Sequence, residues 1–369
     1  MSEDPSRGTP GLAAGFRAGG RRAVRLSAED LVATGPMPGG GRFPLLVQPG
    51  VPDLDAGAWA SGHRERIAGW LLEHGAILLR GFAVDSAEQF RELARAVTPG
   101  LLDYQERAAP RVEVAKHVFT STEYPADQAI PLHHEMSYSH NWPGKIWFFC
   151  LQPAERGGAT PIVDDRELFP RLDAAIKRRF LERRVMYVRN YGGGVDLPWQ
   201  EVFQTRERAE VEAYCRQARM ECEWRDGDRL RTRAVRQVVA THPRTGDTVW
   251  FNHAHMFHVS NLEPSVRAAL LAEFDEDELP RNAFYGDGSP IENAVLDEIR
   301  ALYRSLAVTF PWQRGDVLLL DNVLASHGRE PFSGPRRIVV AMADLHTDPA
   351  HAGPAPDAPA PGPSAGQGG

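Results

Sequence analysis

The sequence predicts an α+β, mainly β fold in which an antiparallel β-sandwich or jelly roll carries helical insertions. Three observations support this fold class. Short runs rich in β-branched and aromatic residues recur along the chain, turn signals separate the runs of the last third, and long amphipathic helical patterns interrupt the series. With 369 residues, of which 42% are hydrophobic, the chain is long enough to bury a large core.

Each expected element rests on its own local signal. Apolar residues at helical spacing run from residue 55 to residue 74 and stop at Gly75, and Ser86 is a good N-cap for the helix that follows. Thr245-Gly246-Asp247 and Arg314-Gly315-Asp316 mark turns between strands. The expected helices span 55–74, 86–97, 166–184, 207–219 and 264–279, and the expected strands span 76–80, 145–150, 248–251, 306–310, 317–320 and 338–343.

The two ends of the chain differ in composition from the part between them. Residues 1–43 are rich in Gly, Arg, Pro and Ala without sustained periodicity, and residues 347–369 repeat Pro, Ala and Gly. Neither end can bury enough apolar surface to offset its ordering entropy, so both are expected to be flexible. No linker of this composition interrupts residues 44–346, which we therefore expect to form one domain.

Composition narrows the classes of function. The net charge of −7, with both signs mixed along the sequence, argues against a nucleic-acid-binding surface. The three cysteines lack C-x-x-C spacing, which argues against a disulfide framework or a cysteine zinc site and fits a reducing compartment. No apolar run is long enough to cross a bilayer, and no apolar stretch follows Arg21-Arg22 as it would in a signal peptide. We therefore expect a cytoplasmic protein without membrane contact.

Two short segments, far apart in the sequence, carry the ligand types of a metal site. The first is Leu132-His133-His134-Glu135, and the second ends in Ser326-His327. On a strand, residues i and i+2 point to the same face, so His133 and Glu135 could bind one ion while His134 points away. Two imidazoles and one carboxylate form a facial triad that suits Fe(II), and by affinity alone also Mn, Co or Zn. An isolated H-x-E pair is more often an ordinary surface feature, so the surrounding sequence has to decide.

Three collinear blocks carry a family resemblance that extends over residues 44–345. They are LHHEMSYSHNWPGKIWFFCLQPAERGGATPIVD, THPRTGDTVWFNHAHMFH and PWQRGDVLLLDNVLASHGREPFSGPRRIVVAM. The chain resembles the taurine dioxygenase (TauD/TfdA-like) superfamily of Fe(II)/2-oxoglutarate-dependent oxygenases. It looks most like the syringomycin-type aspartyl hydroxylases, which are amino-acid hydroxylases of nonribosomal peptide pathways. The resemblance implies a double-stranded β-helix (jelly roll) core.

The resemblance also assigns roles to particular residues. His133, Glu135 and His327 match the iron ligands of the family. Thr160 matches a residue that hydrogen-bonds the 2-oxoglutarate carboxylate, and Arg337 matches the arginine that binds the distal carboxylate. An arginine suits that task because its planar fork of donors binds a carboxylate bidentately.

Neighbours of these residues carry further expectations. Strand alternation should turn Arg336 away from the site if Arg337 faces it. Asp321-Asn322 lies just before the second metal histidine in the sequence, and we expect this pair to brace that histidine.

Departures from the family pattern narrow the chemistry. Many members carry Asp at the position of Glu135, and the longer carboxylate should still bind the metal. A carboxylate here argues against halogenation, because halide-binding relatives lack it. The taurine enzyme holds its sulfonate with an arginine four residues after the co-substrate arginine. That position is Ala341 in this chain, so a sulfonate substrate is not expected.

The resemblance implies an oxidoreductase that uses Fe(II), 2-oxoglutarate and O2 to hydroxylate an unactivated C–H bond. The expected target is the β-carbon of an amino acid, free or tethered to a peptidyl carrier protein, in natural-product or antibiotic biosynthesis. The iron performs the oxidation, while the protein positions the target carbon and excludes water. Alternatives are the same cofactor chemistry on another small carboxylate (hydroxylation, desaturation or cyclisation), a non-catalytic ligand-binding jelly roll, and a zinc hydrolase. A zinc hydrolase would leave Thr160 and Arg337 unexplained.

Substrate contacts are less sharply defined by the sequence. The candidates are His117 in a strand-like stretch, Ser137 beside the metal motif, and His255 within the histidine-rich segment 252–258. Core packing explains each of them equally well, and a second metal site built from that segment is the less ordinary outcome. Five arginines between Arg225 and Arg236 fit a solvated hairpin face better than a docking surface for an acidic carrier protein. A homo-oligomer is compatible with the sequence.

Overall fold

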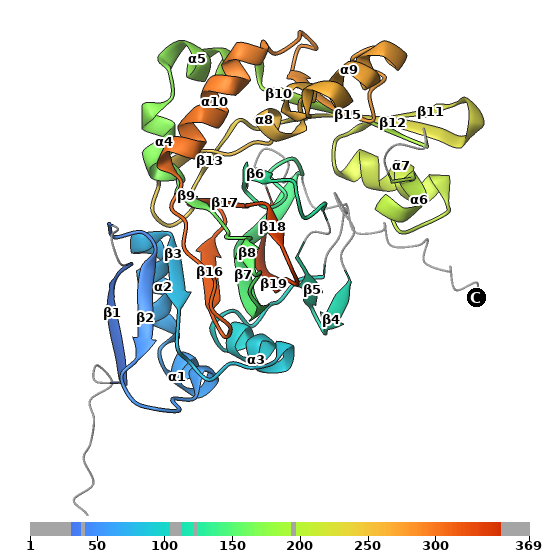
Figure 1. Ribbon diagram of the computed structural model, residues 1–369. Helices are drawn as coiled ribbons and strands as arrows, with labels where there is room; N and C mark the ends of the chain where they lie inside the picture. Colours follow the sequence, from blue (N-terminus) through green and yellow to red (C-terminus); the bar gives the residue numbers. More distant parts are fainter. Residues whose placement is uncertain (1–30, 38–40, 104–111, 122–123, 193–196, 348–369) are drawn as a thin grey trace, which may run out of the picture.

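An eight-stranded sheet forms the centre of the protein, which a computed structural model describes for residues 31–37, 41–103, 112–121, 124–192 and 197–347. Its strands follow the order β1-β2-β3-β16-β7-β19-β5-β4, and neighbours are antiparallel except for β2 and β3 (Figure 1). The strands are β1 Val32–Pro36, β2 Leu45–Pro49, β3 Ala76–Leu79, β16 Val317–Asp321, β7 Asn141–Gln152, β19 Arg337–Thr347, β5 Val118–Thr120 and β4 Glu113–Ala115.

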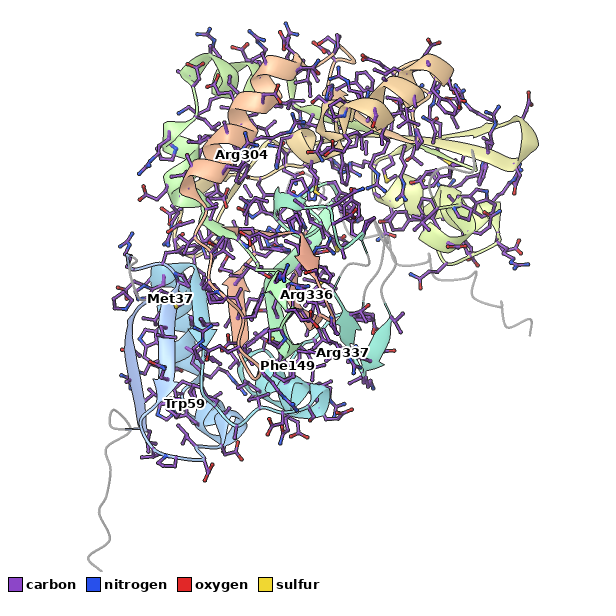
Figure 2. The ribbon with its side chains drawn as sticks, in the orientation of Figure 1. Met37, Trp59, Phe149, Arg304, Arg336 and Arg337 are labelled. Carbon is purple, nitrogen blue, oxygen red and sulfur yellow. The ribbon has the colours of Figure 1, made fainter. Side chains whose placement is uncertain are left out.

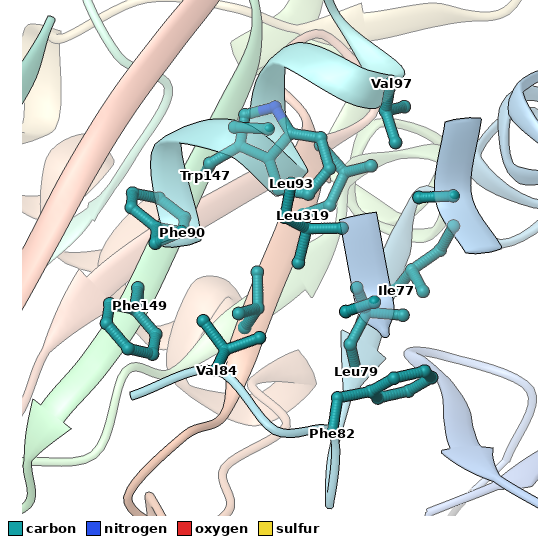
Figure 3. Packing of buried hydrophobic residues seen from close by; sticks show 14 of the residues in the cluster. Ile77, Leu79, Phe82, Val84, Phe90, Leu93, Val97, Trp147, Phe149 and Leu319 are labelled. Atoms are coloured by element: carbon teal, nitrogen blue, oxygen red, sulfur yellow. The ribbon is translucent and has the colours of Figure 1, made fainter. Parts of the chain in front are cut away.

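Three helices cover one face of this sheet: α1 Ala56–Gly62, α2 Arg64–His74 and α3 Ala87–Val97. Figure 3 shows the core between the helices and the sheet, where Phe90 of α3 stacks on Phe149 of β7 with ring centroids 5.2 Å apart. The predicted glycine stop is confirmed, because Gly75 ends α2 with a φ of 73°.

The opposite face of the sheet packs against a small three-stranded sheet in the order β6-β17-β9, with bounds Ile130–His133, Ala325–Arg329 and Ile162–Asp164. The two sheets and the core between them confirm the predicted jelly roll with helical insertions. Side chains alternate along β19. Ile338, Val340 and Met342 face the small sheet, whereas Val339 and Ala341 face the helices.

A second layer of structure lies above the jelly roll in Figure 1 and contains a four-stranded sheet in the order β11-β12-β10-β15. The strands of this sheet are β11 Glu221–Arg225, β12 Arg229–Arg236, β10 Val185–Tyr191 and β15 Arg281–Tyr285. The helices around it are α4 Asp165–Arg171, α5 Ala174–Arg183, α6 Trp199–Val202, α7 Arg208–Gln217, α8 Ala254–Phe257, α9 Pro264–Glu273 and α10 Asn293–Leu306. A two-stranded sheet of β13 Val239–Thr241 and β14 Thr248–Trp250 precedes α8.

Several expected elements have different bounds in the structure. Residues 55–74 form two helices that meet at His63, and 166–184 divides at Leu172-Asp173, where the Asp173 side chain caps α5. The strand expected at 306–310 is wrong: α10 runs through Leu306, and only Val308 makes a bridge, to Ile162.

The expected ends of the domain also need correction. Val32–Pro36, expected to be flexible, forms edge strand β1 by pairing with β2. Residues 348–369, which make up nearly all of the expected flexible tail, lie outside the described residues, as do residues 1–30. Among the described residues, no helix combines the length and the apolar character needed to cross a membrane.

The arginine-rich segment forms the predicted hairpin, but its face is only partly solvated. Arg231 is 2% exposed and pairs with Asp277 and Glu278, and the buried Arg236 donates to the carbonyl oxygen of Ala218 at 3.0 Å. Because these guanidinium groups are engaged inside the protein, the hairpin does not present all five arginines as one basic surface.

Candidate metal centre

Strand pairing brings the two predicted histidine ligands together. His133 ends β6 and is the direct cross-strand partner of His327 in β17. Their ring centroids lie 4.5 Å apart. Strands joined in this way fix both side chains on the same side of the small sheet, although the residues are far apart in the sequence.

Glu135 reaches the same place from a turn rather than from a strand. β6 ends at His133, so the alternation argument that placed Glu135 beside it does not apply. Asn322 fixes the turn instead. Its Oδ1 accepts from Glu135 N at 2.7 Å, and its Nδ2 donates to Glu135 O at 3.0 Å. The Glu135 carboxylate then lies 3.8 Å from His327 Nε2. We expected Asn322 to brace the second histidine, but its side chain braces the acid.

These three residues fit one metal ion. The ligand atoms that His133, Glu135 and His327 offer all lie within 4.8 Å of one another, and among the described residues this is the one such group. Two imidazole nitrogens and one carboxylate oxygen are the donor set of a non-haem iron facial triad. The second metal site in residues 252–258, which the sequence analysis gave as the less ordinary outcome, is not formed by the described residues.

His134 is not part of this centre, as expected, although it too lies beyond the end of β6. Its ring is fully buried, with Nδ1 2.8 Å from the carbonyl oxygen of Asn322 and Nε2 3.0 Å from that of Trp250. The carboxylate of buried Asp165 lies 3.5 Å from Nε2. His134 therefore joins three elements behind the metal centre rather than binding the metal.

A cavity opens beside the two metal histidines. Thr160 lies on its wall and accepts a hydrogen bond from Trp312 Nε1 at 3.1 Å. Arg336 also lines it and donates through Nε to the carbonyl oxygen of Gly158 at 2.9 Å. Burial, together with the nearby charge of Arg329, lowers the pKa of Arg336 to about 10. The lining residues are Ser121, Ile130, His133, Phe148, Thr160, His327, Gly328, Arg329, Arg336, Ile338 and Val340.

The structure places Arg336, and not the predicted Arg337, on the wall of this cavity. Arg337 is exposed and, with Arg314, borders a separate surface depression, whereas Arg336 lines the cavity. Both arginines are labelled in Figure 2. Arg336 lies just before β19 and lines this cavity together with Ile338 and Val340 of that strand. Strand alternation does not decide between the two arginines, because the pairing of β19 with β7 is irregular between Arg337 and Ile338.

Two of the three substrate candidates lie elsewhere. His117 sits in the turn between β4 and β5, where its ring nitrogen is 2.7 Å from Asp103, and it does not line the cavity. His255 is buried behind β6, with Nε2 2.7 Å from the carbonyl oxygen of Leu132, and it stacks on Tyr303. Burial lowers the pKa of His255 to about 3, so it is a neutral core histidine.

The third candidate, Ser137, contacts His253, a residue that the sequence analysis did not single out. Its Oγ lies 2.6 Å from Nδ1 of His253, whose ring is 5.4 Å from that of His133. Desolvation lowers the pKa of His253 well below its ordinary value, so this imidazole is neutral beside the metal ligand. From the sequence alone, nothing in the segment 252–258 indicates that His253, rather than His255, lies beside the metal ligands, because this depends on the path of the chain.

Comparison with known proteins gives the family. The model of the "Taurine catabolism dioxygenase TauD, TfdA family" matches residues 42–342. The dapdiamide synthesis protein DdaC of Enterobacter agglomerans is 45% identical over 274 residues, which cover 74% of this chain and 83% of that protein. A clavaminate synthase-like protein of Arabidopsis thaliana is 33% identical over 283 residues, covering 74% of this chain and 82% of that protein.

Solved structures show the same fold. The match to the crystal structure of PvcB from Pseudomonas aeruginosa covers 88% of this chain and 94% of the PvcB chain, with a TM-score of 0.52 and 19% sequence identity. The chain therefore belongs to the taurine catabolism dioxygenase TauD, TfdA family, and it is an iron- and 2-oxoglutarate-dependent dioxygenase.

Proposed function

We propose that this dioxygenase hydroxylates an unactivated C–H bond, at the β-carbon of an amino acid, in natural-product biosynthesis. The observation that carries the proposal is a single cavity that joins two of the metal ligands to Thr160 and Arg336. The 45% identity to a dapdiamide synthesis protein supports a biosynthetic role. The amino acid is either free or tethered to a peptidyl carrier protein.

Arg336, rather than Arg337, holds the distal carboxylate of 2-oxoglutarate in this proposal. Arg336 is half-buried, and no acidic side chain is among the described residues that line the cavity. A buried cation of this kind binds an anion strongly, because the anion replaces the hydration that the cation has lost. Thr160, on the same wall, offers its hydroxyl group to the same carboxylate.

His133, Glu135 and His327 would hold the metal, and three protein ligands of this kind would leave coordination positions for the co-substrate and oxygen. When bound, Fe(II) supplies oxygen activation coupled to the conversion of 2-oxoglutarate to succinate and CO2. The remaining chemistry of the protein is positional. Apolar cavity residues, including Phe148 and Val340, keep water from the reacting groups.

A sulfonate substrate has no support on either strand face. The residue four positions after Arg337 is Ala341, which packs against the helices, and the residue four positions after Arg336 is the apolar Val340. The arginine hairpin likewise gives no support to the carrier-bound substrate, because Arg231 and Arg236 are paired internally. The choice between free and carrier-bound substrates therefore depends on direct assay.

Succinate release with Fe(II), 2-oxoglutarate and O2 tests the proposal. Free amino acids are compared with the same amino acids loaded on a carrier domain, and the product mass is measured for each. A gain of one oxygen on either form supports hydroxylation and tells which form is the substrate. A loss of two hydrogens would indicate desaturation or cyclisation. Oxygen-independent turnover would refute the proposal.

A further inference from the structure

The cavity contains a second buried arginine, Arg329, at the end of β17. It is 6% exposed and lines the cavity together with Arg336. Its terminal nitrogens donate to the carbonyl oxygens of Tyr124 at 3.0 Å, Pro125 at 2.5 Å and Gln128 at 2.7 Å. Its Nε is buried and has no hydrogen-bond partner among the described residues. Of its five N–H groups, three therefore bind the loop 124–128, and the Nε–H and one N–H of Nη1 remain.

Arg329 and Arg336 contact one aromatic ring. Their Cζ atoms lie 5.2 and 5.4 Å from the ring centroid of Phe332. Two cations held near each other, in a cavity whose described lining has no acid, cost free energy that a bound anion recovers.

We infer that Arg329 is a second binding residue for the far carboxylate of the co-substrate, and that it couples the loop 124–128 to co-substrate binding. The inference rests on the proposed function, which assigns this cavity to 2-oxoglutarate. Arg336 uses Nε for Gly158 and keeps its terminal nitrogens for the carboxylate, while Arg329 uses its terminal nitrogens for the loop and keeps Nε. A 2-oxo acid without the far carboxylate gains nothing from either arginine.

Calorimetric titration of the Mn(II)-loaded full chain tests this inference without turnover. The two probes are N-oxalylglycine, a dicarboxylate, and 2-oxovalerate, which lacks the far carboxylate. Arg329→Lys keeps a charge but removes the Nε donor, and Arg329→Gln removes the charge as well. In both variants the affinity for N-oxalylglycine should fall by about tenfold or more, because a charge-assisted hydrogen bond is lost. Their affinity for 2-oxovalerate should stay within about twofold of the wild-type value.

The difference in affinity loss between the two probes distinguishes a role of Arg329 in binding the carboxylate from a purely structural role. An equal loss for both probes would overturn the inference, because that result is expected if Arg329 only supports the loop. Unchanged affinity for N-oxalylglycine in both variants would also overturn it, while leaving the proposed function intact. If the wild-type protein itself fails to bind N-oxalylglycine, the proposed function fails first.

Hydrogen exchange tests the coupling to the loop. N-oxalylglycine should slow exchange of the backbone amides in residues 124–128 of the wild-type protein, and it should do so less in Arg329→Lys. Arg337→Gln is the matched control, because that arginine lies outside the cavity and should change neither measurement. Equal protection of the loop in the wild type and Arg329→Lys would refute the coupling.

Discussion

Replacing Arg336 or Arg337 by Gln, one at a time, tests which arginine anchors the co-substrate. The two residues are adjacent and carry the same charge; Arg337 is the first residue of β19, and Arg336 immediately precedes it. Only Arg336 lines the cavity with Thr160 and the metal histidines. The pair is therefore well matched, since a general effect of charge or of strand stability would appear in both variants.

The magnitude follows from the kind of contact. Hydrogen bonds to a charged group contribute about 1.5–3 kcal/mol each, and breaking a buried ion pair costs about 3–5 kcal/mol. A loss of about 3 kcal/mol corresponds to a rise of roughly 100-fold in the KM for 2-oxoglutarate. The turnover number at saturation should change much less, because Arg336 would hold the carboxylate equally in the ground and transition states. For the exposed Arg337, less than about a twofold change is expected.

Stability provides the control. Arg336 donates one hydrogen bond, to Gly158, while its buried charge carries a desolvation cost. The Gln variant should therefore lose no more than about 1 kcal/mol of unfolding free energy in the absence of co-substrate. Initial rates over a range of 2-oxoglutarate concentrations, with a urea melt of each variant, give both quantities. If Arg337→Gln raised the KM by 100-fold and Arg336→Gln did not, the face assigned to β19 would be wrong.

Two further predictions concern the residues that support the metal centre, and a third concerns the pH dependence of stability. His134→Ala should leave Mn(II) affinity nearly unchanged but lower stability by about 2–5 kcal/mol, because two buried carbonyl groups lose their partner; metal titration and a urea melt check this. Asn322→Ala should weaken Mn(II) binding by about 10–100-fold, since the turn that presents Glu135 loses its brace, and an unchanged affinity in titration would contradict this. His258 has a pKa lowered to about 4 by burial and by Arg300, so the unfolded chain binds its proton first as pH falls below about 6.5. The free energy of unfolding should therefore be about 2 kcal/mol lower at pH 5 than at pH 8. In His258→Asn this difference, measured by urea melts at the two pH values, should be smaller.

The fold class was predictable because its signals are local. Strand composition, turn residues and caps such as Ser86 depend on a few neighbouring residues, and the structure contains the corresponding elements. The strand expected at 306–310 failed because its apolar run continues the buried face of α10 and then crosses to the small sheet. Short apolar runs do not distinguish a helix end from a strand.

The face of β19 could not be read from its sequence. Ile338 to Met342 are all apolar, because one side packs against the helices and the other against the cavity side of the jelly roll. A strand buried on both faces lacks the polar alternation that would reveal its orientation. The choice between Arg336 and Arg337 therefore needed the sheet itself. The same limit applies to Glu135, whose position depends on contacts with the distant Asn322.

Gly157 and Gly158 explain why the cavity arginine is held in one place. Both glycines have positive φ, 66° and 71°. Gly157 ends β8 (Arg156–Gly157), which pairs with β18 (Phe332–Ser333), and a Cβ on Gly157 would lie 2.2 Å from a backbone oxygen of that neighbouring segment. A Cβ on Gly158 would lie 3.0 Å from Arg336 Cδ, while the Gly158 carbonyl oxygen accepts from Arg336 Nε. The close approach that glycine permits thus orients Arg336 and sets Thr160, two residues further on, on the same wall. The segment Gly157–Thr160 therefore specifies both residues proposed to hold the co-substrate, although only its threonine stands out as a binding residue in the sequence.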